Sequence, residues 1–227
     1  MKLYSHCWIV IPAYQEADLI GTVVRQVRQS FPHVVVVDDG STDDTAQQAA
    51  AAGATVLRHL INLGQGAALQ TGIAYALQRG ADYLVTFDAD GQHRLEDVEK
   101  MLAILCEQQL DVVLGSRFLG QTIGMSWGRW ALLQVAIWFT RLTTGLPLTD
   151  AHNGLRVFSR QAAQQLRLRQ NQMAHASEIL EQIAQQQMKY AEVGNTIAYT
   201  EYSRGKGQKA SSAIHILVDL FIGRLSK

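Results

Sequence analysis

Several features that mark particular classes of protein are scarce or missing in this sequence. Its two cysteines, Cys7 and Cys106, lie in apolar runs without the spacing of metal ligands, so we expect buried thiols in a reducing compartment rather than disulfides or a zinc site. The 20 basic residues balance the 20 acidic ones, and this zero net charge gives no reason to expect nucleic acid as a partner. No stretch reaches the roughly 18 uninterrupted apolar residues that would span a bilayer, and residues 1–10 lack the pattern of a signal peptide. These absences together predict a cytoplasmic protein.

The first half of the chain alternates short runs of β-branched residues with longer segments of helical periodicity. The expected strands cover residues 8–11, 34–37, 55–57, 83–87 and 111–114. The expected helices cover residues 16–30, 42–52, 66–79 and 95–108, and the second half adds a helix near 174–188 and strands near 190–200. Ser41 or Thr42 is expected to cap the second helix. This alternation predicts one α/β domain with a mostly parallel sheet flanked by helices, whose active site gathers at the carboxyl ends of the strands.

The residues directly after the fourth expected strand are the first candidates for chemistry. Asp88 and Asp90 place two carboxylates two positions apart at the end of an apolar run. A hard cation such as Mg²⁺ or Mn²⁺ takes oxygen ligands and is often held by one or two carboxylates together with substrate phosphates. These residues therefore suit a metal-bound diphosphate, with Gln92 or His93 as an added ligand. The alternative is a turn whose acids cap the helix from residue 95.

Two other strand ends also carry polar clusters. Asp38 and Asp39 are adjacent acids that repel each other, so either they cap the helix that follows or ligand groups such as ribose hydroxyls and base N–H groups offset their charge. Gly64 and Gly66 precede a helix, where free backbone N–H groups form a natural anion site. A simple turn would use the same glycines.

The polar clusters at the strand ends indicate a function more specifically as an ordered set than any one of them does alone. The chain contains, in order, I-P-A-Y-x-E, V-D-D-G-S-x-D-x-T, N-x-G-x-G-x-A, D-A-D-G-Q-H and N-G-L-R-V-F. This set resembles the family 2 glycosyltransferases, and most nearly the dolichyl-phosphate and polyprenyl-phosphate mannosyl- and glucosyltransferases, over residues 8–160. The resemblance implies a GT-A fold, a Mg²⁺ or Mn²⁺ ion and inverting transfer of a hexose from a nucleotide sugar of the GDP-mannose or UDP-glucose type. It also implies a single domain over residues 1–227, with a nucleotide-sugar half at about 8–120 and an acceptor half at about 121–227.

The resemblance assigns roles on the donor side. The nucleoside pocket would be lined by Pro12, Tyr14, Glu16 and Asp39. Asp88 and Asp90 would be catalytic, with Asp88 beside the donor and Asp90 contacting the metal together with Gln92. Asp88 would support that metal site. A basic loop carrying Arg204 and Lys209 would close over the donor diphosphate, although the serine that relatives usually have before this lysine is missing here.

The resemblance also assigns an acceptor side. Arg117 and Arg129 would hold an acceptor phosphate, and Arg156 belongs to the same region. A lipid phosphate already carries a negative oxygen, so arginines that grip it bidentately would suffice. A sugar hydroxyl in a cell-envelope glycan would instead need a carboxylate to take its proton, and Asp150 is the candidate base in that case. Asp150 has a second interpretation as the acid of a turn, so the acceptor stays open between polyprenyl phosphate and a hydroxyl.

Two segments of the second half are rich in aromatic and aliphatic residues. One of them, residues 123–148, contains Trp127, Trp130 and Trp138, and the other, residues 211–225, repeats its character. Such segments are typical of helices that lie at a membrane surface, but core helices or the face of a homo-oligomer have the same composition. Peripheral contact with the inner face of the plasma membrane is therefore one of three interpretations.

Overall fold

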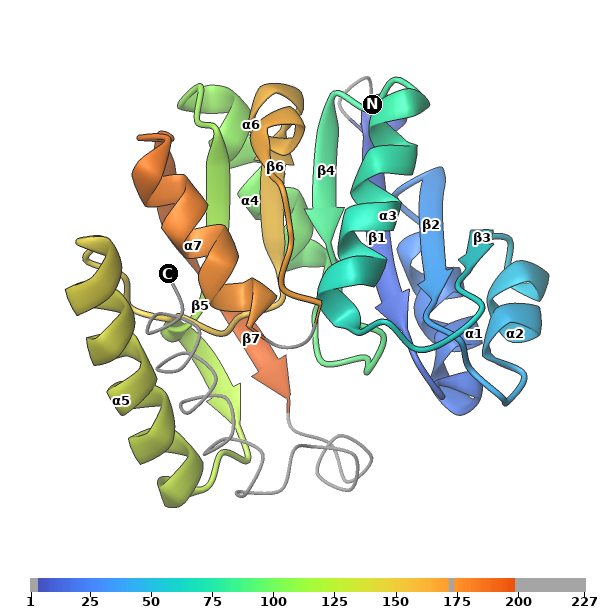
Figure 1. Cartoon of the computed structure of the whole chain (residues 1–227), viewed down its shortest axis with the longest axis horizontal. Helices are drawn as coiled ribbons and strands as arrows, with labels where there is room; N and C mark the ends of the chain where they lie inside the picture. Colours follow the sequence, from blue (N-terminus) through green and yellow to red (C-terminus); the bar gives the residue numbers. More distant parts are fainter. Residues whose placement is uncertain (1–3, 172–173, 199–227) are drawn as a thin grey trace.

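The structure, a computed structural model, describes residues 4–171 and 174–198, which form a seven-stranded sheet with helices on both faces (Figure 1). The strands are β1 (Cys7–Ala13), β2 (His33–Asp38), β3 (Thr55–Arg58), β4 (Tyr83–Thr86), β5 (Val112–Ile123), β6 (Arg156–Ser159) and β7 (Tyr190–Ala198). The helices are α1 (Ala17–Val27), α2 (Thr45–Ala51), α3 (Gln65–Gln78), α4 (Leu95–Glu107), α5 (Trp127–Thr144), α6 (Arg160–Gln165) and α7 (His175–Gln185), after a short 3₁₀ helix η1 (Tyr4–His6). Arg204, Lys209 and the segment 211–225 lie outside the described residues.

The sheet is the middle of three layers, and strand β1 shows how the sequence produces this arrangement. Cys7 and Ile9 point into the apolar core that α1, α2 and α4 close, while Trp8 and Val10 point into the opposite core, which α3, α5, α6 and α7 close. Successive side chains of a strand face opposite sides of a sheet. A strand buried on both sides therefore reads as an unbroken apolar run, as β1 and β2 do.

The predicted mostly parallel sheet flanked by helices is confirmed. Its strand order is β3-β2-β1-β4-β6-β5-β7. The predicted elements from the first strand to the helix at 95–108 are all present, with ends that differ by a few residues. Strand β5 is longer than predicted, and β6 and α6 were not predicted at all. The segment near 190–200 contains one described strand, β7, in place of several.

The direction of β6 decides what lies at the edge of the sheet. This strand is antiparallel to both of its neighbours, and its first residue, Arg156, pairs with Thr86 of β4 and with Leu114 of β5. The residues that precede β6 therefore share an edge with the residues that follow β4 and the middle of β5. The loop before β6 is thus brought to the same edge as the D-A-D-G-Q-H motif.

Helix α3 lies unusually close to the sheet because it contains Gly72. A Cβ atom at this position would lie 2.4 Å from Cγ1 of Val10 and 3.2 Å from Cγ2 of Val37. Both valines are completely buried, and their β-branched side chains have few alternative rotamers. No side chain larger than hydrogen fits at this contact without displacement of the strands.

We expect Gly72→Ala to lower the free energy of unfolding by about 1–3 kcal/mol, because overpacking outweighs the roughly 1 kcal/mol that alanine gains in helix propensity. Gly21 in α1 is a matched control, since a Cβ there would meet only the end of Arg25 at 3.4 Å and a carbonyl oxygen at 3.6 Å. Gly21→Ala should stabilise the protein by about 0.5–1 kcal/mol. Urea unfolding followed by circular dichroism measures both values. Equal effects of the two substitutions would contradict the close approach of α3.

Candidate active site

The site is built around Asp88, two residues after the end of β4. One carboxylate oxygen, Oδ2, accepts a hydrogen bond from Nε2 of His93 at 3.0 Å, and Oδ1 accepts one from Nε2 of Gln65 at 3.2 Å. Burial by itself raises the pKa of Asp88, but the hydrogen bond and charge of His93, with Arg156 and His175 adding to them, bring this pKa below its ordinary value. Asp88 is therefore ionised near neutral pH and held in one orientation, with 27% of its side chain exposed.

Gly154 lies directly against this carboxylate. A Cβ atom on Gly154 would lie 2.0 Å from Oδ2 of Asp88, which no side chain can do. The hydroxyl of Thr86 donates to the carbonyl oxygen of Gly154 at 2.6 Å and so ties the loop before β6 to the last residue of β4. The glycine of the N-G-L-R motif is thus required by the close approach of backbone to Asp88.

Asp90 occupies the same turn with fewer partners. Its Oδ1 accepts the backbone N–H of the half-buried Gln92 at 3.1 Å. Burial, and then the negative charge of Asp88, raise the pKa of Asp90 to about 6. The two carboxylates thus repel each other inside a partly buried turn, and a cation beside them would relieve this repulsion.

The donor atoms present fit a divalent cation that arrives with a ligand. Within the described parts of the chain, no group of three or more His, Cys, Asp or Glu side chains forms a complete metal site. Mg²⁺ and Mn²⁺ take oxygen ligands, and Mg²⁺ is usually bound by one or two carboxylates with substrate phosphates completing its shell. Asp88 and Asp90 match this mode, because they supply two hard oxygen donors but not a full cage.

The adjacent acids at the end of β2 are neutralised from within the chain. Oδ1 of Asp38 accepts the backbone N–H of Ser41 at 3.0 Å, and Arg58 lies 3.1 Å from its Oδ2. Asp39 accepts from Nδ1 of His59 at 2.7 Å and from the N–H groups of residues 63 and 64 at 3.0 and 2.6 Å. These contacts offset the charge of the two acids, for which the sequence had left helix capping or a bound ligand as explanations. Oδ2 of Asp39 accepts one hydrogen bond from the chain, so one of its lone pairs is unused.

The other predicted nucleoside contacts lie on the first loop. Pro12 is buried near the end of β1, past the last pair that β1 forms with β4, so its missing N–H removes no bond from that ladder. Tyr14 is 47% exposed and Glu16 is half-buried. These residues lie at the carboxyl ends of β1 and β2, as the fold predicts for a binding edge.

The expected cap of α2 by Ser41 or Thr42 is wrong. The helix begins at Thr45, whose N–H is accepted by Oδ1 of Asp43 at 3.0 Å. Ser41 and Thr42 instead accept hydrogen bonds from the backbone and side chain of Gln15, at 2.9 and 2.8 Å. Gln15 has a positive φ of 56°, so these bonds hold the loop after β1 in an uncommon conformation.

The interpretation of Gly64 and Gly66 as an open anion site is also wrong. The N–H of Gly64 donates to Asp39, and the N–H of Gly66 donates to the carbonyl oxygen of Asn171 at 2.8 Å. A Cβ atom on Gly66 would lie 2.0 Å from the carbonyl oxygen of Gln170. These glycines therefore serve a turn and a close crossing of two backbone segments.

Arg117 of β5 and Asp150 of the loop before β6 form a buried ion pair. Nε of Arg117 donates to Oδ2 of Asp150 at 2.6 Å, and its Nη2 donates to the carbonyl oxygen of His152 at 2.6 Å. Asp150 also accepts from the backbone N–H groups of Arg117 and His152 at 3.1 and 3.3 Å. The predicted acceptor arginine and the predicted base are thus each other's partners in the interior, 6% and 4% exposed.

Arg156 has a different environment. It is 2% exposed, yet its guanidinium makes no hydrogen bond or ion pair within residues 4–171 and 174–198. Burial lowers the pKa of Arg156 to about 10, against the charges of Asp88 and Asp150, which raise it. A buried cation without hydrogen bonds, near an ionised aspartate, is costly unless a ligand completes it.

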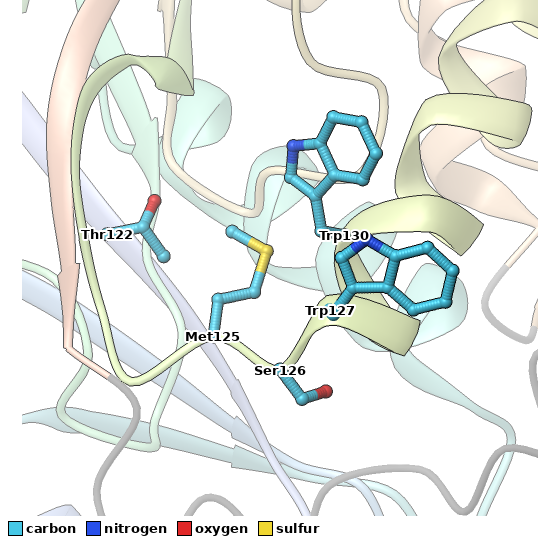
Figure 2. A pocket seen from close by; sticks show the side chains of 5 residues that line it. All are labelled: Thr122, Met125, Ser126, Trp127 and Trp130. Carbon is cyan, nitrogen blue, oxygen red and sulfur yellow. The ribbon is translucent and has the colours of Figure 1, made fainter.

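Helix α5 carries an apolar surface that the described residues do not cover. We call the side chains of Trp127, Trp130, Val135, Trp138 and Leu142, which are 46–80% exposed, the α5 apolar face. Trp127 and Trp130, at the N-terminal end of this face, line a pocket of about 620 Å³ together with Thr122, Met125 and Ser126 (Figure 2).

Arg129 lies in the first turn of α5, on its exposed surface, and its backbone N–H donates a hydrogen bond to the side chain of Ser126. None of the described helices is long and apolar enough to cross a membrane.

The sequence interpretation did not assign roles to Gln65, His152 or His175 around this site. Each is a common residue type on a loop or a helix terminus, with no spacing that relates it to Asp88. Only the register of β4, β6 and β5 shows which loops share the edge.

Known proteins resemble this chain in sequence and in structure. Residues 8–167 match the model of glycosyl transferase family 2. The chain is 33% identical to a protein of Methanocaldococcus jannaschii over 96% of this chain and 92% of the relative. It is 29% identical to the UDP-N-acetylglucosamine–dolichyl-phosphate N-acetylglucosaminyltransferase of Methanococcus voltae, over 97% and 96%. It is also 31% identical to the polyprenol monophosphomannose synthase of Mycolicibacterium smegmatis, over 70% and 64%.

Among solved structures, the glucosyl-3-phosphoglycerate synthase of Mycobacterium tuberculosis superposes with a TM-score of 0.74 at 19% identity, over 99% of this chain and 81% of that one. A complex of the same enzyme with Mn²⁺ and uridine-diphosphate-glucose superposes with a TM-score of 0.71 at 20% identity and the same coverage. At this identity the likeness establishes the fold, which is GT-A. Because the family model matches most of its length, the chain belongs to glycosyl transferase family 2 and is a glycosyltransferase.

Proposed function

We propose that this enzyme transfers a hexose from a nucleotide sugar to a polyprenyl phosphate, with inversion and with the help of Mg²⁺ or Mn²⁺. The observation that carries the acceptor assignment is Arg156, a buried guanidinium without a hydrogen bond among the described residues, beside the ionised Asp88. The printed names of two relatives support it, since one acts on dolichyl phosphate and the other makes polyprenol monophosphomannose.

On the donor side, the proposal assigns the diphosphate to the turn that carries Asp88 and Asp90. Asp90, with Gln92, would contact the metal, and Asp88 would orient the donor, because His93 and Gln65 already fix its carboxylate. A bound divalent ion would stabilise the charge that grows on the departing diphosphate. The solved structures of the synthase contain Mn²⁺ or Mg²⁺ with uridine nucleotides, which agrees with this assignment.

The nucleoside would lie against the loops after β1 and β2. Pro12, Tyr14, Glu16 and Asp39 are our proposed contacts there, and Tyr14 offers an exposed ring on which a base can stack. Arg204 and Lys209 remain proposed ligands of the diphosphate. The division into donor and acceptor halves also remains a proposal, since strands from both halves form one sheet.

The transfer itself would need no general base. An oxygen of the acceptor phosphate forms the bond to the anomeric carbon, the bond from that carbon to the β-phosphate oxygen breaks, and the nucleoside diphosphate leaves with the electron pair. The nucleophile is already ionised, so the chain has only to position it and to exclude water. Arg156 suits this task because its planar fork can bind two phosphate oxygens.

A hydroxyl acceptor is the alternative, with Asp150 as the base. The geometry favours it less, because Asp150 is buried and accepts hydrogen bonds from Arg117, from two backbone N–H groups and from Asn153. Both oxygens of this carboxylate are already occupied as hydrogen-bond acceptors, so it is poorly placed to take the proton of a hydroxyl. We propose instead that Arg117 and Asp150 fix the loop before β6, and that Arg129 reaches the acceptor from the start of α5.

The α5 apolar face would bring the enzyme to its lipid. Tryptophans favour the headgroup level of a bilayer, where the ring is partly apolar and the indole N–H is hydrated. We propose a peripheral contact with the cytoplasmic leaflet through this face, while a second copy of the chain would be the competing occupant.

Asp90→Asn should reduce nucleotide-sugar turnover by about 100-fold or more, because it removes charge where the departing diphosphate is stabilised. The measurement is release of nucleoside diphosphate over a titration of Mg²⁺ and of Mn²⁺, and the metal concentration for half-maximal rate should rise. Asp18→Asn, on the exposed surface of α1, is the control and should behave as the wild type. Turnover of the wild-type enzyme that is unchanged by EDTA would refute the metal assignment.

The acceptor is tested by incubating the enzyme with radiolabelled nucleotide sugars and bacterial membrane lipid, followed by extraction. We expect label in the polyprenyl-phosphate fraction, and Arg156→Met should abolish it by loss of the phosphate contact. Arg25→Met, on the surface of α1, serves as the control. Label found only in soluble or polymeric glycan, and lost in Asp150→Asn, would support the hydroxyl acceptor instead.

Membrane contact is tested by flotation with vesicles that contain anionic phospholipid. Replacing Trp127 and Trp138 together by serine should lower the bound fraction by about tenfold or more, because two large apolar side chains no longer enter the interface. Leu60→Ser with Ile61→Ser is the matched control, since these apolar residues lie on the loop after β3 and are at least as exposed as the two tryptophans. A change of oligomeric state in light scattering, without any change in flotation, would show that the α5 apolar face binds a second copy.

A further inference from the structure

His152 is a half-buried residue whose two ring nitrogens are buried and have no assigned role. Both of its ring nitrogens are shielded from solvent and hydrogen-bond to nothing in the part of the chain that the structure describes. The backbone of the same residue is held on both sides, because its N–H donates to Asp150 and its carbonyl oxygen accepts from Arg117. The ring is thus placed by its backbone while its own donor and acceptor are unused.

Such a group calls for an explanation, since nearly all buried polar atoms in native proteins have a hydrogen-bond partner. An apolar side chain of similar size would avoid the cost of burying an imidazole. A ligand that bonds to the ring would remove that cost in the working enzyme.

The neighbourhood of His152 indicates what kind of ligand this is. Arg117, Arg156 and Asp150 all act on the ring electrostatically. Arg117 and Asp150 neutralise each other, which leaves Arg156 as the cation whose donors are unused. Burial, with the two arginines adding to it and Asp150 opposing, lowers the pKa of His152 to about 4. The ring is therefore neutral at physiological pH and offers one N–H donor within the electrostatic influence of the Arg156 guanidinium.

We propose that His152 donates a hydrogen bond to the phosphate monoester of the acceptor, next to the oxygens that Arg156 binds. This inference rests on the proposed function, because it requires an acceptor phosphate at Arg156. A terminal monoester has three unsubstituted oxygens. Two of them can accept from the guanidinium fork, one of these two can also accept from the imidazole, and the third is left for attack. A phosphodiester has only two, so the pair selects a terminal phosphate.

The test compares His152→Met, which removes both ring nitrogens, with His152→Gln, which restores an N–H donor. With a polyprenyl phosphate as acceptor, His152→Met should raise the acceptor KM by about 10-fold to 100-fold, the loss expected for one hydrogen bond to a charged group. The donor KM should not change, and His152→Gln should recover most of the affinity. The melting temperature of His152→Met should be equal to or above that of the wild type, because a costly buried polar group is gone.

Arg156→Met separates this inference from the proposed function. If Arg156→Met leaves the acceptor KM unchanged, the acceptor site itself is misplaced. If Arg156→Met raises the acceptor KM and His152→Met does not, the role of His152 is refuted and the proposed function is still supported. A lower melting temperature with an unchanged acceptor KM would also refute it and would make His152 a structural residue.

A second measurement detects binding at the ring of the wild-type protein directly and needs no kinetic assay. In ¹⁵N-histidine spectra of the wild-type protein, the ring signals of His152, identified by their absence in His152→Gln, should shift when a short polyprenyl phosphate is added. Inorganic phosphate should shift the same signals at higher concentration. Saturating acceptor without a shift would overturn the proposal.

The pH dependence of stability checks that the ring is buried and neutral. The pKa of His152 lies below the ordinary value of 6.5 in the folded state, so the unfolded chain takes up the proton first as the pH falls. Proton uptake by this residue leaves the free energy of unfolding unchanged above about pH 6.5 and lowers it progressively toward pH 4. The melting temperature of the wild type should therefore fall further than that of His152→Met between pH 7.5 and pH 5. Parallel decreases would contradict a buried neutral ring.

Discussion

The contact between Gly154 and Asp88 is the constraint on which the site depends. It exists because β6 runs against its neighbours, so that the chain enters this strand at the edge where β4 ends. Thr86 fixes the approach by donating to the carbonyl oxygen of Gly154, and the absence of a side chain at Gly154 leaves space for the Asp88 carboxylate. A fully parallel sheet of the same strands would place the N-G-L-R motif at the opposite edge, far from the aspartates.

This arrangement brings several charged side chains to one edge of the sheet. Two of them form an ion pair with each other, and two do not. Arg117 and Asp150 form an ion pair that holds the loop before β6, so their charges do not need a ligand to offset them. Asp90 and Arg156 are not paired in this way, and burial shifts the pKa of each toward its uncharged form. Groups left with that cost are the natural places for a cation and for an anion, respectively. The proposed donor diphosphate with its metal and the proposed acceptor phosphate match these two needs.

Much of the fold could be predicted from the sequence because β1, β2 and β4 are buried on both faces and read as uniform apolar runs. The strand β6 could not, since a run of four residues that begins with Arg156 has no recognisable period. The same limit applies to the site. Asp88 and Asp90 follow a clear strand and were recognised, whereas the pairing of Arg117 with Asp150, and the use of the N–H groups of Gly64 and Gly66, depend on contacts between distant segments. The local sequence pattern identifies candidate side chains, but only the register of the strands shows which of them already have hydrogen-bond or ion-pair partners within the chain.

The choice between a lipid phosphate and a glycan hydroxyl as acceptor depends on two parts of the molecule that the described residues leave without partners. One consists of the ring nitrogens of His152 and the guanidinium of the buried Arg156, to which the described residues offer no hydrogen bond. The other is the exposed α5 apolar face. Both lie along the segment that leads from β5 through α5 to β6. A glycan hydroxyl would give neither of them a function, because it carries no charge for Arg156 and no apolar chain for α5. A lipid phosphate has an anionic head and an apolar tail, and this one ligand class accounts for both features.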